Sequence, residues 1–205
     1  AGDLLCALAG PADTASLAPA PALLLSFSST WQSALMEPPY DVAVQAFVAA
    51  GHVALSFDLP NHGQRVNQHG EGIAGLCAAF LAGDDPFARF VADGKKAIDG
   101  CLTRGLGAGG FFACGTSRAA YCALRLAAAD RRIGAVAGFA PVTDWRRLAE
   151  FAAERDNPAV AELALTNWVD DLAGRAVYLA IGNQDARVGT DACVHLAWRL
   201  LVAGA

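Results

Sequence analysis

The chain has 205 residues, of which 55% are hydrophobic and 17% are charged, and its formal net charge is −5. This length and composition exclude a disordered chain and predict a single globular domain over residues 1–205 with a substantial core. The negative charge and the lack of a dense Lys/Arg cluster argue against a nucleic-acid partner, and the longest apolar runs are too short to span a membrane.

Strands and helices are expected to alternate along the chain. Strands are predicted at residues 22–27, 52–57, 111–114, 133–139 and 176–181. Helices are predicted at residues 3–9, about 39–51, within 70–83, from 86 to about 102, directly after 115–119, twice within 145–171, and at about 190–202. The run at residues 22–27 is apolar without alternation, which is typical of a strand covered on both faces. The pattern therefore predicts an α/β fold, with a mostly parallel sheet and helices on both faces.

The six cysteines form no C-x-x-C pair, and most of them lie among apolar residues. We interpret them as small buried side chains in a reducing compartment, which predicts a cytoplasmic location. The amino-terminal stretch has no basic region and is interrupted by Asp3 and Pro11, so it does not resemble a signal peptide. No His, Cys and carboxylate residues have the spacing of metal ligands, and neither a metal nor an organic cofactor is expected.

The most informative stretch is Gly115-Thr116-Ser117-Arg118-Ala119, which follows an apolar run and precedes an alanine-rich helical pattern. It matches the nucleophile-elbow motif G-x-S-x-G, with Ala119 in the last glycine position. In such a turn the serine sits at the apex in a strained conformation, and the small flanking residues let strand and helix pass closely. The motif predicts Ser117 as a nucleophile, and an ordinary Gly-Ser turn before a helix is the alternative.

With this context the chain resembles the α/β-hydrolase superfamily from about residue 22 to residue 202. The stretch Asp58-Leu-Pro-Asn-His-Gly63 resembles the D-x-P-G-H-G loop of many members, in which the histidine, here His62, is usually structural. Residues 182–188 resemble the G-x-x-D-x-x-V acid loop of prolyl-oligopeptidase-like and dienelactone-hydrolase-like enzymes. The resemblance implies a serine hydrolase that cleaves a small carboxylic ester, in which Asp185 orients a catalytic histidine.

The resemblance also implies an oxyanion hole made of two backbone N–H groups. One belongs to Arg118, directly after the nucleophile, and the other is expected at Ser28, with Phe27 as the neighbouring choice. Ser26-Phe27 stands where the family often carries His-Gly, so a polar turn without this role is the alternative. Asp144 could serve as another triad acid, but an Asp after a strand is more often a helix cap, and we prefer that interpretation.

The catalytic histidine and the last strand of the family are both missing. The one histidine after Asp185 is His195, which lies within a predicted helix and does not resemble a base carried by a loop. We therefore expect a longer native chain, with the histidine beyond Ala205, and the alternative is a chain without a conventional triad. A non-catalytic scaffold that binds a small ligand or a protein is the competing function, and a peptidase or amidase is a further one. The oligomeric state stays open.

Residues 145–171 are expected to form two helices. Their aromatic residues Trp145, Phe151 and Trp168 predict either a small helical cap over the site or ordinary packing of helices on the sheet.

Overall fold

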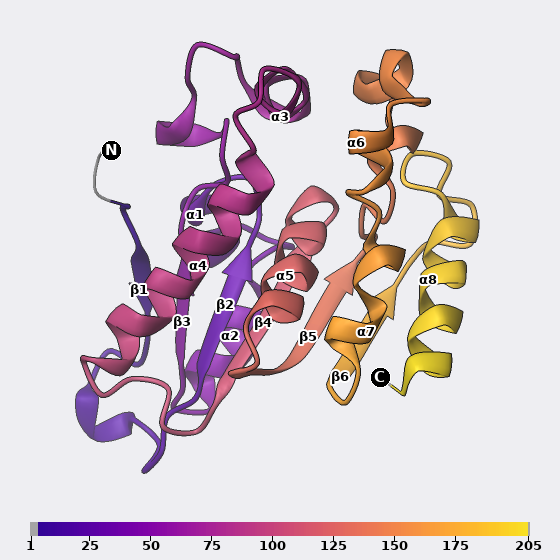
Figure 1. The fold of residues 1–205 in the computed structure, drawn as a ribbon. Coiled ribbons are helices and arrows are strands. Elements are labelled where there is room, and N and C mark those ends of the chain that lie inside the picture. The colour runs from indigo at the N-terminus through magenta and orange to yellow at the C-terminus, as the bar shows by residue number, and fades with distance from the viewer. Residues whose placement is uncertain (1–3, 205) are drawn as a thin grey trace.

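A computed structural model of the protein describes residues 4–204. Six strands form one sheet in the order β1-β3-β2-β4-β5-β6 (Figure 1). They are β1 (Ala7–Ala9), β2 (Leu23–Phe27), β3 (Val53–Ser56), β4 (Phe111–Thr116), β5 (Ile133–Phe139) and β6 (Ala176–Ala180). Strand β1 pairs antiparallel with β3, and all other neighbours are parallel. The predicted α/β class with a mostly parallel sheet is confirmed.

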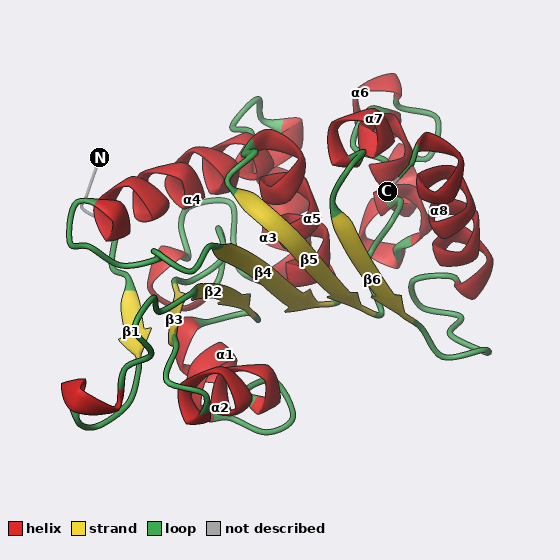
Figure 2. Cartoon of the chain, turned by 90° about the horizontal axis from the view of Figure 1, so that it is seen from below, coloured by secondary structure: helices red, strands yellow, loops and turns green. Residues whose placement is uncertain are grey.

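Helices cover the two faces of the sheet unequally, as Figure 2 shows. One face carries α1 (Trp31–Met36) and α2 (Val42–Ala49), which lie under β2 and β3. The other face carries α3 (Gly72–Leu81), α4 (Pro86–Leu102), α5 (Arg118–Ala129), α6 (Pro158–Ala161), α7 (Val169–Leu172) and α8 (Thr190–Ala203). The parallel strands all end at the upper edge of the sheet in Figure 1, where the loops that follow them meet.

The main core lies between the sheet and the pair α4–α5. Phe27 of β2 packs edge-on against Phe90 of α4, with 4.9 Å between the ring centroids. Gly94 of α4 lies so close to Leu126 of α5 that an added Cβ would be 2.6 Å from the leucine side chain. Glycine at this position therefore lets α4 and α5 pack closely against each other.

Two predictions near the amino terminus are corrected by the structure. The helix expected at residues 3–9 is wrong: Ala7–Ala9 is strand β1, which pairs with β3, and residue 3 lies outside the described residues. The free edge of β3 offers ladder hydrogen bonds that a short apolar segment accepts in preference to an isolated helical turn. Helix α1 was not predicted. Its start has a local cap, since Thr30 Oγ1 accepts the N–H of Ser33 at 3.2 Å, and a distant one, since Asp58 Oδ1 accepts the N–H of Trp31 at 2.9 Å.

The helices expected within residues 145–171 are much shorter than predicted, although one of them, α6, does begin at Pro158 with Asn157 as its cap. The segment instead forms short turns: η3 (Trp145–Arg147), η4 (Ala149–Glu154), α6, η5 (Leu165–Trp168) and α7. Trp145 and Phe151 are fully buried, and the Trp145 ring packs against Phe87 of α4 and Tyr121 of α5. Deep burial of irregularly spaced side chains explains why the segment bends from turn to turn. These two aromatic residues therefore belong to the core.

The sheet has one bare face, on the side of α1 and α2, where no helix of residues 4–204 covers β5 and β6 (Figure 2). An open apolar cavity of about 510 Å³ lies there, and its lining includes Phe112, Ala137, Phe139 and Tyr178. Within the described part of the chain, no strand follows α8 or pairs with the outer side of β6. On α8 itself, Val194, Trp198, Leu201 and Val202 are exposed. We call the uncovered surface of β5 and β6, on the side of α1 and α2, the bare face.

Five of the six cysteines are buried and Cys6 is half-buried, and all six are free thiols. Burial raises the pKa of the Cys114 thiol, so this side chain behaves as an apolar residue of the sheet. Within residues 4–204, no helix combines the length and the apolar character that a membrane span requires.

Candidate active site

Ser117 occupies the sharp turn between β4 and α5. Its backbone has φ 58° and ψ −123°, a left-handed conformation that a non-glycine residue rarely adopts. Three backbone hydrogen bonds hold it there: its N–H donates to the Phe139 carbonyl at 2.8 Å, and its carbonyl accepts from Tyr121 and Val142, both at 3.2 Å. Strain of this kind persists only where the surrounding structure enforces it, as β5 and α5 do here.

Gly115 and Ala119, two residues before and two residues after Ser117, must be small because strand and helix pass closely here. A Cβ added to Gly115 would lie 2.6 Å from the carbonyl carbon and oxygen of Ala119. Ala119 is itself fully buried at the start of α5. The helix can therefore pass over the end of β4 only with residues of this size. This geometry confirms the close passage of strand and helix expected from the sequence.

The predicted oxyanion donors lie at the ends of neighbouring strands. Strand β2 pairs with β4, and Phe27 lies opposite Gly115, so Ser28 leaves the sheet beside the turn that carries Ser117. Among residues 4–204, no acceptor takes the backbone N–H of Ser28 or of Arg118. Both groups are therefore free to donate to an anionic oxygen placed between the two loops.

The Arg118 side chain joins three loops, a role that the sequence did not predict. Its Nε donates to His62 Nε2 at 2.8 Å, and its Nη2 donates to Ser29 Oγ at 2.5 Å. The His62 ring in turn donates from Nδ1 to the Pro60 carbonyl at 2.8 Å, so both ring nitrogens are engaged. Burial, and then the charge of Arg118, lower the pKa of His62, which favours a neutral ring. His62 is thus structural, as expected.

Asp58 also holds these loops in position. Its Oδ1 accepts the N–H of Trp31 at 2.9 Å, and its Oδ2 accepts the N–H of Gln64 at 2.8 Å. Gly63 has φ 52°, and an added Cβ would lie 2.3 Å from Asp58 Oδ2, so a larger residue does not fit. The Asp58–Gly63 loop therefore holds the loop after β2 in position.

Asp185 lies in the loop between β6 and α8 and is half-buried. Its Oδ1 accepts two backbone N–H groups, from Arg187 at 2.9 Å and from Val188 at 3.0 Å. No donor among residues 4–204 reaches its Oδ2, which is free to accept a further hydrogen bond. Strand β5 separates β6 from β4, and no hydrogen bond joins Asp185 to Ser117. The structure thus places both residues at one edge of the sheet without bringing them into contact.

Glu150 of η4 pairs with the loop that carries Asp185. It accepts a hydrogen bond from Arg187 Nη2 at 2.7 Å. Burial opposes ionisation of Glu150, but the Arg187 hydrogen bond and the charges of Arg187 and Arg118 outweigh it and lower the pKa of the carboxyl group. The sequence did not single out Glu150 or Arg187, because 37 residues separate them.

None of the four histidines contacts Ser117 in the described part of the chain. His62 is engaged as above, and His52 Nδ1 accepts the N–H of Ala22 at 3.4 Å. His69 lies beside Asp84. His195 is exposed on α8, where its ring stacks on Trp198 with 6.3 Å between centroids. Among residues 4–204, no histidine therefore hydrogen-bonds to Ser117.

Asp144 is a helix cap. It stands at the start of η3, and its Oδ1 accepts the N–H of Arg146 at 3.0 Å, while its carboxylate pairs with the Arg146 guanidinium at 2.7 Å. The preferred interpretation of Asp144 is confirmed. Within residues 4–204, no three His, Cys, Asp or Glu side chains gather as metal ligands do.

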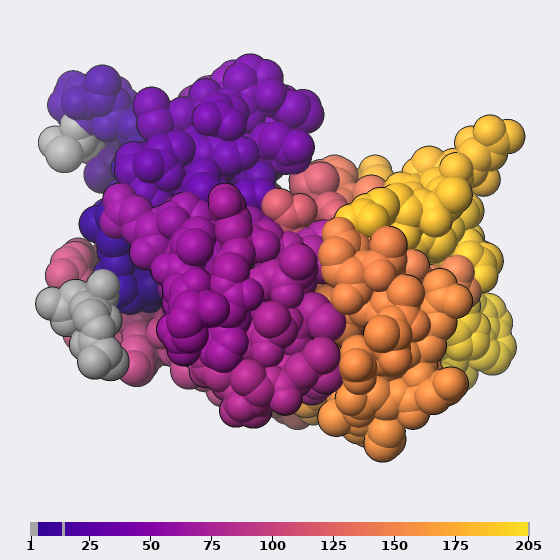
Figure 3. Space-filling model, turned by 90° about the horizontal axis from the view of Figure 1, so that it is seen from above, coloured from indigo at the N-terminus to yellow at the C-terminus, as the bar shows by residue number. Residues whose placement is uncertain are grey.

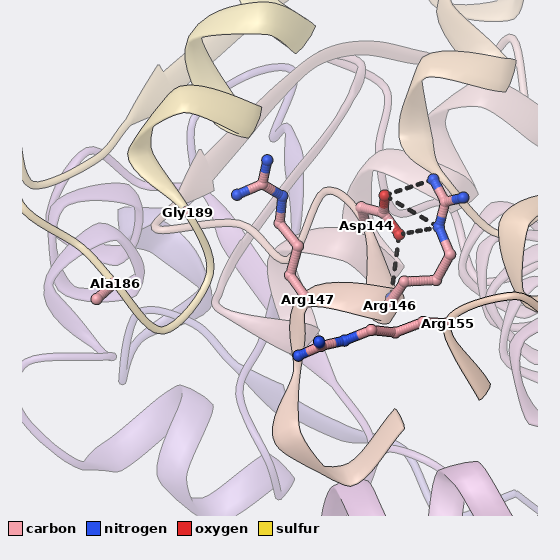
Figure 4. A pocket seen from close by; sticks show the side chains of 6 residues that line it. All are labelled: Asp144, Arg146, Arg147, Arg155, Ala186 and Gly189. Carbon is pink, nitrogen blue, oxygen red and sulfur yellow. Dashed lines mark hydrogen bonds and ion pairs between the residues drawn. The ribbon is translucent and has the colours of Figure 1, made fainter. Parts of the chain in front are cut away.

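From above, salmon-coloured atoms are visible between the violet segments and the orange and yellow ones (Figure 3). A cavity of about 460 Å³ lies beside the loop that carries Asp185, and Figure 4 shows the side chains that line it. Its lining is Asp144, Arg146, Arg147, Arg155, Ala186 and Gly189.

No protein-family model matches the chain, and no curated protein sequence matches it. Several solved structures match the chain. A dipeptidyl aminopeptidase IV candidate from Bacteroides ovatus has a TM-score of 0.72 at 16% identity, over 98% of this chain and 29% of that one. A cold-adapted esterase from an Arctic intertidal metagenomic library has a TM-score of 0.65 at 19% identity, over 95% and 73%. Acetyl xylan esterase from Paenibacillus sp. R4 has a TM-score of 0.64 at 16% identity, over 90% and 66%.

These likenesses cover nearly the whole chain and show that it has the α/β-hydrolase fold that its motifs predict. The chain spans 29% of the length of the peptidase-like structure and 66% of the acetyl xylan esterase. At identities below 20%, what is shared is the fold.

Proposed function

We propose that the protein is a serine hydrolase that cleaves small carboxylic esters through Ser117. The observation that carries the proposal is the strained backbone of Ser117, with φ 58°, at the carboxyl end of a central strand and directly before a helix. A serine in this position presents its Oγ to the loops at the edge of the sheet. Esterases among the similar structures support an ester in preference to an amide.

In the proposed reaction, Ser117 Oγ attacks the ester carbonyl carbon while a histidine accepts the serine proton. The carbonyl oxygen becomes an anion, which receives hydrogen bonds from the N–H groups of Ser28 and Arg118. One such donor contributes on the order of 3 kcal/mol to transition-state stabilisation. The C–O bond then breaks, and the histidine returns the proton to the leaving alcohol. Water, activated by the same histidine, hydrolyses the acyl-serine and restores Ser117.

Asp185 is the proposed partner of that histidine. Because its Oδ1 is held by two backbone N–H groups, its Oδ2 is left for the imidazole N–H. A carboxylate in this place fixes the tautomer of the ring and stabilises its charged form.

We propose that the histidine belongs to polypeptide outside residues 4–204 that packs on the bare face. The outer side of β6 and the adjoining apolar surface would then be covered, as edge strands usually are. The loop leading into such a segment would lie beside Asp185, at the same end of β6.

The second candidate function is a non-catalytic scaffold that binds a small ligand or a protein. It is favoured by one observation: among residues 4–204, no imidazole contacts Ser117. A peptidase is a further alternative, suggested by the peptidase-like structure, of which this chain spans 29%.

Hydrolysis of 4-nitrophenyl acetate by the native full-length protein separates these functions. We expect turnover that the Ser117→Ala variant loses and that the Ser16→Ala variant keeps, because Ser16 is exposed and lies outside the site. A wild-type rate equal to that of Ser117→Ala would favour the scaffold.

A further inference from the structure

The cavity beside the acid loop is unusually basic for this protein. Three of its lining side chains are arginines, Arg146, Arg147 and Arg155, against a single carboxylate, Asp144. The whole chain carries a formal net charge of −5, so this concentration of arginine is local. The two remaining lining residues, Ala186 and Gly189, belong to the loop that holds Asp185.

Two of the three arginines are already paired with carboxylates, one of which, Asp144, also lines the cavity. Arg146 is paired with Asp144 through Nε and Nη2, at 2.9 Å and 2.7 Å. Arg147 donates from both Nη atoms to the Asp191 carboxylate of α8, at 2.8 Å and 2.6 Å. Arg147 also packs on Gly189, since a Cβ added there would lie 2.6 Å from Arg147 Nη1.

Arg155 differs from the other two. No hydrogen-bond acceptor or carboxylate among residues 4–204 pairs with its guanidinium, and its side chain is exposed. In Figure 4 the Arg155 side chain extends across the cavity from η4 toward the loop that carries Ala186. A planar guanidinium offers two parallel N–H donors that match the oxygens of a carboxylate or a phosphate.

The N-terminal end of α8 adds to the positive electrostatic potential of the cavity. Gly189 is the residue before α8, a helix of 14 residues, so the positive end of its dipole faces the same cavity. Asp191 in the first turn offsets part of this effect, and its carboxylate is already shared with Arg147. The uncommitted positive group is therefore Arg155.

We infer that this cavity binds an acidic group, a carboxylate or a phosphate, of the ester substrate, with Arg155 as the main donor. The inference rests on the proposed function, because Ala186, which lines the cavity, directly follows the proposed triad acid Asp185. The cavity volume of about 460 Å³ is large enough for such a group together with several carbon atoms. The site would select esters that carry a second, acidic function.

Direct binding tests the site without turnover. Isothermal titration of the full-length protein with monomethyl succinate and with inorganic phosphate is compared between wild type, Arg155→Gln and Arg131→Gln. Arg131 is the matched control, an exposed arginine two residues before β5, at the opposite edge of the sheet. We expect Arg155→Gln to weaken binding roughly tenfold or more, since a hydrogen bond from a charged donor is lost, and Arg131→Gln to have no effect.

A hydrolysis assay then relates the site to the substrate. For wild type, kcat/KM for mono-4-nitrophenyl succinate is expected to exceed that for the neutral 4-nitrophenyl methyl succinate. Arg155→Gln should abolish this preference by lowering kcat/KM for the acidic ester, and Arg131→Gln should keep it. Binding of monomethyl succinate would identify a carboxylate site, and binding of phosphate alone a phosphate site. Turnover of the neutral ester with no anion bound and no preference would overturn the inference and leave the proposed function standing. Anion binding through Arg155 without any turnover would overturn the proposed function instead.

Discussion

Replacing Arg118 with Met tests whether its side chain positions the oxyanion loop. The change keeps the backbone N–H and much of the stem but removes the donors to His62 at 2.8 Å and to Ser29 at 2.5 Å. Hydrogen bonds from a charged donor contribute about 1.5–3 kcal/mol each. Since Arg118 is partly exposed, we expect the two together to lower the free energy of unfolding by about 2–3 kcal/mol.

The effect on catalysis follows because Ser29 directly follows Ser28, whose N–H is a proposed oxyanion donor. Loss of the Ser28 N–H would cost about 3 kcal/mol in the transition state, or roughly a hundredfold in rate. The loop keeps one anchor, because Leu59 N–H still donates to the Ser29 carbonyl at 3.1 Å. We therefore expect kcat to fall between roughly tenfold and a hundredfold, with KM nearly unchanged.

The assay is steady-state hydrolysis of 4-nitrophenyl acetate together with urea unfolding. Arg118→Lys, which keeps the charge without the planar fork, should recover part of kcat, and Arg131→Met should resemble wild type. A folded Arg118→Met protein with wild-type kcat would refute the reasoning, because the loop would then be positioned without this side chain.

Three further predictions concern the same machinery. Gly115→Ala should lower the free energy of unfolding by about 1–3 kcal/mol, because its Cβ would lie 2.6 Å from the Ala119 backbone, whereas Gly134→Ala has no contact closer than 4.0 Å and serves as the control in urea unfolding. Asp185→Asn should keep the loop, since Oδ1 still accepts both N–H groups, yet lower kcat by about 10³–10⁴; a loss below tenfold would remove Asp185 from the triad. Because the pKa of His62 is lowered in the folded state, the unfolded chain binds more protons, and the free energy of unfolding should fall as pH drops below about 6.5. The variant His62→Gln should flatten the dependence of Tm on pH. A slope equal to that of wild type would contradict this prediction.

Much of the fold could be predicted from local patterns. Five of the six strands and the turn at Ser117 lie where runs of apolar residues and small residues place them. These features depend on neighbours in the sequence, such as Gly115 and Ala119, which must be small so that one strand and the next helix can cross.

The errors lie where structure depends on distant partners. Strand β1 forms because the edge of β3 is available, and α1 begins with help from Asp58, 27 residues further on. The segment 145–171 follows the buried aromatic residues of α4 and α5 and not a helical period of its own. In the candidate site, the bridge from Arg118 to His62 spans 56 residues, so no sequence motif could show it.

The central claim is that Ser117 is a nucleophile. Intact mass spectrometry before and after reaction with a fluorophosphonate probe, followed by peptide mapping, tests it most directly. The account predicts a single adduct, located on Ser117 and absent from the Ser117→Ala variant. A folded, full-length protein that forms no adduct, or an adduct on a different serine, would contradict it.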